Sequence, residues 1–149
     1  MTTQSLPQQT STIGTGGPAR DDAATLIHLA HLHATLQVSA GLDVLWRDDF
    51  PSDSYTIDAW FAPGTDGRRG LEGVLVWFQT VGTLVKHGLL DPELCRDWAR
   101  ADLAWARIAP LAAADRARTG DETMWANFQR LAAAQAPPDT ERIDLDRAD

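Results

Sequence analysis

Cysteine and lysine are almost missing from this sequence of 149 residues, which contains one cysteine, Cys95, and one lysine, Lys86. A single cysteine excludes an internal disulfide, and no zinc motif can be built from it. A lone thiol suits a reducing cytoplasm, where it is usually a small buried apolar residue. Twelve arginines against one lysine, together with an excess of alanine, indicate the codon bias of a GC-rich, bacterial genome.

Positive charge is also scarce, because 21 acidic residues outnumber 13 basic ones and leave a net charge of −8. Nucleic-acid binding depends on lysines and arginines that neutralise phosphates, so this composition argues against a nucleic-acid partner. Long apolar runs are missing too. Three histidines and a glutamine interrupt the best one, residues 26–42, whereas a membrane span needs about 20 apolar residues. We therefore expect a cytoplasmic protein with no membrane span.

Apolar residues are sparse at both ends of the chain. Residues 1–20 are rich in Thr, Ser, Gln, Gly and Pro, and residues 135–149 combine two prolines with five acids and two arginines. Such segments cannot bury enough apolar surface to offset the entropy lost on ordering. We therefore expect a disordered N-terminal tail at 1–20, a single helical domain at 21–134 and a disordered acidic tail at 135–149.

Helical periodicity fills the central part of the chain, so the sequence predicts an all-α fold, a small bundle of four to six helices. The clearest element is a helix over 71–87 with a wide apolar face. The glycine-rich stretch before it, PGTDGRRG, is predicted to be a loop. The other expected pieces are a helix over 23–39, short helices over 42–46 and 53–61, a helix from Pro92 to Arg107, a segment over 111–118 beyond a kink or break caused by Pro110, and a last helix after a capping box at 119–122.

A helix-turn-helix corner is predicted at Lys86–Pro92, in the sequence KHGLLDP. Gly88 stands where a helix end needs a left-handed residue, and Asp91 with Pro92 supplies the cap and the first turn of the next helix. Lys86 and His87 lie in the last turn, where the helix dipole favours positive charge. Every charged residue here has a structural reason, so we expect no catalytic residue in the corner.

The second half of the chain resembles a known family in three features. A helix rich in aromatic residues ends in KHGLLDP, a tryptophan at 105 is followed by Pro110, and the last helix contains ETMWANFQRLA. In this combination, over residues 71–133, the sequence is similar to an uncharacterised bacterial helical family, domain of unknown function 4760 (DUF4760). The shared residues are packing and turn residues. The resemblance therefore implies a helical fold and carries over no catalytic, ligand or cofactor residue.

A cluster of histidines, HLAHLH, raises the question of a metal site. On a helix, His33 points away from the other two, so only His28 and His31 can share a ligand. A zinc or iron shell would need further ligands from elsewhere. The nearby carboxylates that could supply them are Asp48, Asp49 and Asp53. A metal-dependent enzyme is therefore our alternative hypothesis, whereas the favoured hypothesis involves no metal or cofactor.

Asp102 is the acid whose surroundings are least obvious from the sequence. It is predicted on the apolar border of the third long helix, near Trp98 and Cys95. Burial there would raise the pKa of its carboxyl group unless a positive charge pairs with it. A salt bridge to Arg68 or Arg69 is the interpretation that we favour.

Three arginines form the most distinctive surface feature that the sequence predicts. On a continuous third helix, Arg96, Arg100 and Arg107 would lie within about 40° of one another, opposite the tryptophans. This stripe either pairs with the aspartates of residues 43–58 or receives an acidic segment of a protein partner, such as the tail of a second copy. Trp60 and Phe61 are the aromatic residues that we most expect on the surface. The favoured hypothesis is a protein-interaction or regulatory module that binds a protein partner or itself through these five residues, with no catalytic residue.

Overall fold

The computed structural model describes residues 20–137, and the regular structure of this part is entirely α-helical. The expected all-α fold is confirmed, but this part of the chain contains seven helices in place of the expected four to six. The predicted tails lie outside the described residues except for Arg20 and residues 135–137. The helices are α1 Arg20–Thr35, α2 Val38–Leu45, α3 Ser54–Trp60, α4 Asp66–Lys86, α5 Pro92–Trp98, α6 Ala101–Thr119 and α7 Ala126–Gln135.

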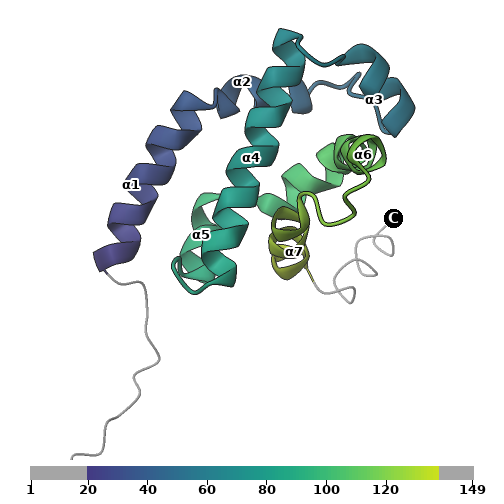
Figure 1. Cartoon of the computed structure of the whole chain (residues 1–149). Coiled ribbons are helices and arrows are strands. Elements are labelled where there is room, and N and C mark those ends of the chain that lie inside the picture. Colours follow the sequence, from purple (N-terminus) through teal and green to yellow (C-terminus); the bar gives the residue numbers. More distant parts are fainter. Residues whose placement is uncertain (1–19, 138–149) are drawn as a thin grey trace, which may run out of the picture.

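α4 is the central helix, and most of the others are arranged around it (Figure 1). It packs most extensively on α2 and α7 and also contacts α1, α5 and α6. Two glycines of α4 allow close approach of the main chains. A Cβ atom on Gly70 would lie 3.0 Å from the Cα atom of Gly41, and one on Gly82 would lie 2.3 Å from the carbonyl oxygen of Asn127. At these two positions the main chain of α4 therefore lies directly against α2 and the start of α7.

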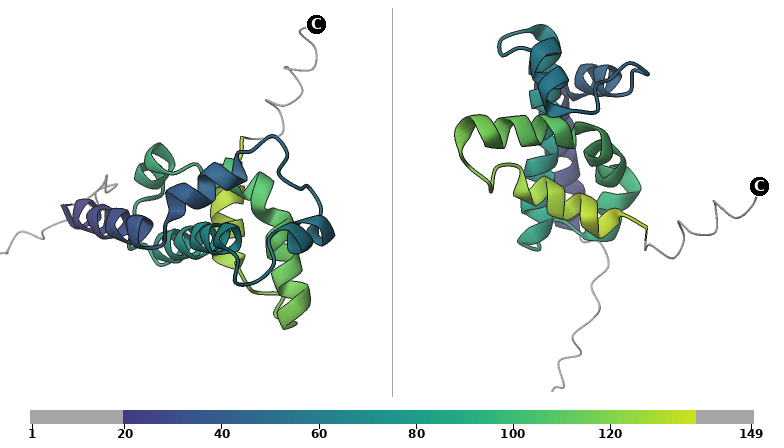
Figure 2. Two further views of the ribbon diagram at one scale, coloured as in Figure 1. Left: turned by 90° about the horizontal axis from the view of Figure 1, so that it is seen from above. Right: turned by 90° about the vertical axis from the view of Figure 1, so that its right-hand side faces the viewer.

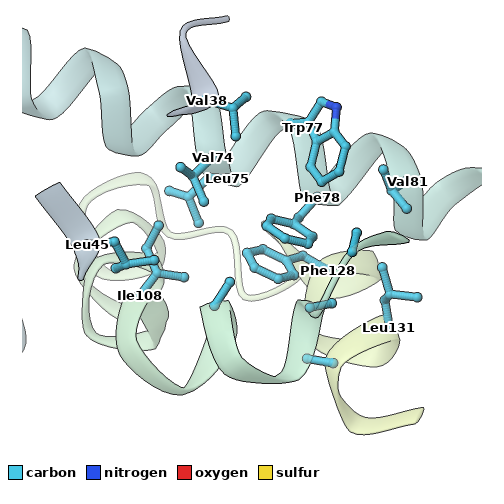
Figure 3. Packing of buried hydrophobic residues seen from close by; sticks show 14 of the residues in the cluster. Val38, Leu45, Val74, Leu75, Trp77, Phe78, Val81, Ile108, Phe128 and Leu131 are labelled. Carbon is cyan, nitrogen blue, oxygen red and sulfur yellow. The ribbon is translucent and has the colours of Figure 1, made fainter. Parts of the chain in front are cut away.

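α6 and α7 lie side by side, joined by residues 120–125, and Figure 2 shows this pair from two further directions. The ring of Phe128 in α7 stacks on that of Phe78 in α4, with centroids 4.6 Å apart and planes 8° apart. Leu45, Val74 and Ile108 extend the same buried cluster from α2, α4 and α6 (Figure 3). The core therefore lies between α4 and the helices α2, α6 and α7.

The first of the predicted long helices is divided in the structure. It was expected over 23–39, but α1 ends at Thr35 and Gln37 adopts a left-handed conformation with a φ of 53°. α2 then starts at Val38, which is fully buried. The sequence shows no glycine or proline at this break. The turn at Gln37 redirects the chain so that α2 packs on α4.

The third predicted long helix is also divided. α5 ends at Trp98, and Ala99 is extended, with a φ of −141° and a ψ of 115°. The side-chain oxygen of Gln135, in α7, accepts a 2.8 Å hydrogen bond from the amide of Ala101 at the start of α6. This buried contact with a distant helix stabilises the new helix start. Pro110 does not divide α6, which continues through it.

Two helix starts differ from those predicted. α4 begins within the predicted loop PGTDGRRG, at Asp66, because the hydroxyl of Thr65 accepts a hydrogen bond from the amide of Arg68. The last helix begins at Ala126, beyond the predicted capping box at 119–122. The cap of α7 comes from α4. The side-chain oxygen of Gln79 accepts hydrogen bonds from the amides of Asn127 and Phe128, in the first turn of α7, at 3.1 and 3.0 Å.

The end of α4 follows the local signals of the sequence. Gly88 has the expected positive φ, 67°. The amide of Leu89 donates to the carbonyl oxygen of Leu84 at 2.9 Å, as in a Schellman motif. At the start of α5, the Asp91 carboxylate accepts a 2.8 Å hydrogen bond from the amide of Leu94. Short-range capping thus determines where α4 ends and where α5 begins.

A buried ion-pair network joins α3, α4 and α6. The Arg68 guanidinium is completely buried and donates to Asp58 at 3.3 Å, to Glu72 at 2.9 Å and to Asp115 at 2.5 Å. Asp115 is 2% exposed and also accepts from Arg118 and from a tryptophan, Trp125 at 3.0 Å. The predicted pairing of Asp102 with Arg68 or Arg69 is therefore wrong. Arg68 lies at the centre of this network, and Arg69 pairs with Asp66.

Candidate functional site

Three tryptophans from different parts of the chain meet at one open cleft of about 350 Å³. Trp77 belongs to α4, Trp98 ends α5, and Trp46 directly follows α2. Trp77 is 3% exposed, whereas Trp46 is 47% and Trp98 42% exposed. Two aromatic side chains that solvent reaches thus lie beside a buried one. We call this feature the tryptophan cleft.

Trp77 is held in place by contacts with two other helices. Its indole N–H donates a 3.0 Å hydrogen bond to the carbonyl oxygen of Leu29 in α1. Its ring meets the rings of Trp98 and of His33 edge to face, each with centroids 5.2 Å apart. The buried wall of the tryptophan cleft is therefore fixed by directional contacts to α1 and α5.

Trp46 is supported by Arg107 of α6. The Arg107 guanidinium lies over the Trp46 ring, 5.5 Å from its centroid. It also donates hydrogen bonds to the main-chain oxygens of Leu45 and Arg47, at 2.7 and 2.6 Å. Because these carbonyl groups belong to the last turn of α2 and the residues just after it, Arg107 both caps α2 and fixes the wall of the cleft.

The tryptophan cleft is mainly apolar, and its lining includes two polar side chains, Arg100 and His33. Arg100 donates two hydrogen bonds to the Asp102 carboxylate, at 2.8 and 2.7 Å. These bonds hold the pKa of Asp102 below its usual value, so the raised pKa considered for an unpaired Asp102 does not arise. His33 also lines the cleft, and burial lowers the pKa of its imidazole. The ionisable side chains that line the cleft are therefore a neutral imidazole and a paired arginine at pH 7.

The three arginines of the predicted stripe do not share one helix. Arg96 lies in α5, Arg100 in the break after it and Arg107 in α6. Arg96 donates to the last main-chain oxygens of α7, those of Ala134 and Gln135, at 3.1 and 3.3 Å. Arg100 lines the tryptophan cleft and Arg107 supports its wall. Their role in binding a partner stays a prediction.

Trp60 and Phe61 lie near a smaller hollow of about 200 Å³. Trp60 is 56% exposed, as the sequence led us to expect. Phe61 is only partly buried and stacks on Phe50, with ring centroids 5.7 Å apart. Arg47 and Asp49, which form an ion pair, also line the hollow. A role of this hollow in partner binding likewise stays a prediction.

The residues of the alternative metal site do not come together. His28 and His31 are exposed on α1, and Asp49 forms a 2.9 Å ion pair with Arg47. Within residues 20–137, no group of three or more His, Cys, Asp or Glu side chains could hold a metal ion. The metal-enzyme hypothesis therefore finds no support.

Within residues 20–137, no helix is long and apolar enough to cross a membrane.

Reasoning from the sequence missed the tryptophan cleft. It assigned Trp98 to the core face of a continuous helix, whereas the break at Ala99 leaves this side chain 42% exposed. The signal that could have pointed to the cleft is the number of tryptophans, six in a chain of 149 residues. A small core rarely needs all of them, because tryptophan is seldom fully buried.

Comparison with known families finds a match to DUF4760, a domain of unknown function, over residues 20–135. The match extends from the first residue of α1 to the last residue of α7. It therefore also covers the three helices α1 to α3, which lie outside the resemblance over residues 71–133. No curated protein and no solved structure matches the chain.

Proposed function

The chain belongs to the DUF4760 family, whose description gives no function, and we propose from its geometry that it is a protein-binding module. The tryptophan cleft is the proposed contact surface. One observation carries the proposal. Trp46 and Trp98 keep nearly half of their surface in solvent although neighbouring side chains hold both in place.

The composition of the cleft favours a protein partner. Tryptophan and arginine are the residue types most enriched where truncation weakens protein complexes, and the cleft combines Trp46 and Trp98 with Arg100. An apolar side chain of a partner would displace water from both indole rings, and each Å² of apolar surface buried contributes about 25 cal/mol. Because Trp77 and Arg107 hold the walls, little conformational entropy would be lost on binding.

Ring contacts support a larger surface that includes Trp60 and Phe61. The Arg107 guanidinium lies over the rings of both Trp46 and Phe50, 5.5 and 5.7 Å from their centroids. Phe50 in turn stacks on Phe61. We propose that the hollow beside Trp60 forms the edge of the partner surface and the tryptophan cleft its centre, where the strongest contributions to binding are expected.

We propose the cytoplasm as the location of this module and regulation of its partner as its role. The lone thiol, Cys95, is fully buried, and burial raises its pKa to about 11. Such a thiol needs no oxidising compartment and packs as a small apolar residue. We base the proposed regulatory role on the tryptophan cleft, whose walls Trp77 and Arg107 hold in place.

Photo-crosslinking in the native cells tests the proposal. A photo-reactive amino acid replaces Ala30, which lines the cleft, and in a matched control it replaces Ala133, an exposed residue of α7. We expect a specific protein adduct from position 30 that Trp98→Ala abolishes, and no such adduct from position 133. The same adducts from both positions, or adducts that persist in Trp98→Ala, would refute the proposal.

A further inference from the structure

A second groove lies between the end of α4, α5 and α7, and most of its charged lining residues are basic. Its volume is about 350 Å³. Val85 and Leu131 supply apolar surface, and the acid among its lining residues is Glu93. Three cations line it, Lys86, Arg96 and Arg130. We call this feature the basic groove.

The cations of the basic groove have no carboxylate partner among residues 20–137. Arg96 donates to main-chain oxygens at the end of α7, and Arg130 donates to the side chain of Asn127 at 3.2 Å. By contrast, the structure pairs five arginines elsewhere with acids: Arg47, Arg68, Arg69, Arg100 and Arg118. On a chain with a net charge of −8, such a groove is complementary to an acidic ligand.

We propose that residues 139–149 of the same chain bind in the basic groove. α7 ends at Gln135, which itself lines the groove together with Ala134, so the chain leaves α7 at the edge of the groove. It contains five acids and two arginines, which gives a net charge of 2 − 5 = −3. In an extended segment Ile143 and Leu145 would share one side, where they can contact the apolar part of the groove.

Chain length favours the chain's own segment over that of a second copy. Three residues, 136–138, separate Gln135 from the first acid of the segment, and they span at most about 10 Å. Such a short linker gives an effective concentration in the millimolar range, far above the concentration of a second molecule in most solutions. The remaining 11 residues extend to about 35 Å, which is enough to pass through the groove.

Paramagnetic broadening in the full chain tests this proposal. A nitroxide is attached to Ala148→Cys, and the native thiol does not compete because Cys95 is buried with a pKa of about 11. We expect broadening of the amide signals of residues around Lys86 and Arg130. This broadening should be independent of protein concentration and should weaken at high salt, which screens the charges.

Two double variants with the same change of charge decide whether the groove is responsible. Lys86→Glu with Arg130→Glu should abolish the broadening. Arg47→Glu with Arg69→Glu, at exposed positions outside the groove, should preserve it. Equal losses in the two variants, or no broadening at the groove, would overturn the proposal. Broadening that appears only between labelled and unlabelled molecules would assign the groove to a second copy and would also overturn it. None of these outcomes depends on the tryptophan cleft.

Discussion

The indole N–H of Trp77 donates a 3.0 Å hydrogen bond to the main-chain oxygen of Leu29, and this buried bond joins α4 to α1. α1 packs only on α2 and α4 to any extent within the part of the chain that the structure describes. Because Trp77 is also the buried wall of the tryptophan cleft, this bond links the position of α1 to that wall.

Replacing this indole tests how much the bond contributes. Trp77→Phe removes this bond but leaves the Leu29 oxygen with its main-chain partner inside α1, and a typical hydrogen bond contributes about 0.5–1.5 kcal/mol to stability. Trp105→Phe is the control, since it removes the same atoms from a partly buried tryptophan whose indole makes no hydrogen bond within residues 20–137. Urea unfolding should show a larger loss for Trp77→Phe. Equal losses would mean that the hydrogen bond contributes nothing measurable.

The stability of the fold should respond very differently to single and double substitutions in the buried ion-pair network around Arg68. Arg68→Met leaves the Asp115 carboxylate buried without its main partner, which typically costs about 3–5 kcal/mol. The double variant, Arg68→Met with Asp115→Leu, removes both buried charges and should be more stable than Arg68→Met alone. Denaturant unfolding of the two variants measures this difference. A double variant that is less stable than the single one would show that the network stabilises the fold beyond its charge balance.

His33 should make stability depend on pH in the weakly acidic range. Burial lowers the pKa of His33 in the folded chain, whereas an unfolded histidine has a pKa of about 6.5. The folded state therefore binds fewer protons, so the stabilisation is complete above the unfolded pKa and is lost as the pH falls through the folded pKa. Unfolding midpoints at pH 7 and pH 5 should differ less in His33→Gln than in the native chain. His31→Gln, at an exposed position of the same helix, should leave the difference unchanged.

Local signals were sufficient to predict most of the central helix and its C-terminal end, although they did not reveal the cap at Thr65 that starts it. The apolar face of residues 71–87 is buried in α4, with Leu71, Val74, Leu75 and Val81 fully inaccessible to solvent. Gly88 and Asp91 act as the sequence indicated, because capping involves only residues within one or two turns. These features could be predicted since each depends on neighbours in the sequence.

Features that depend on distant residues could not be predicted. The start of α7 is capped by Gln79 and that of α6 by Gln135, side chains that are 48 and 34 residues away from the amides they bind. Periodicity alone also cannot show that a helix breaks at Ala99, which is why the arginines seemed to form one stripe. The tryptophan cleft was missed for the same reason, since its three aromatic residues converge only in the folded chain.

The affinity of the partner captured by photo-crosslinking at position 30 tests the central claim most directly. Calorimetric titration would compare the native chain with Trp98→Ala and with Tyr55→Ala, an 85% exposed aromatic residue of α3 that does not line the cleft. Circular dichroism would verify that each variant is folded. We expect Trp98→Ala to weaken binding by about thirtyfold, which corresponds to the 2 kcal/mol typical of an interface hot spot, and Tyr55→Ala to leave it unchanged. Equal affinities for all three proteins would contradict the assignment of the tryptophan cleft as the binding surface.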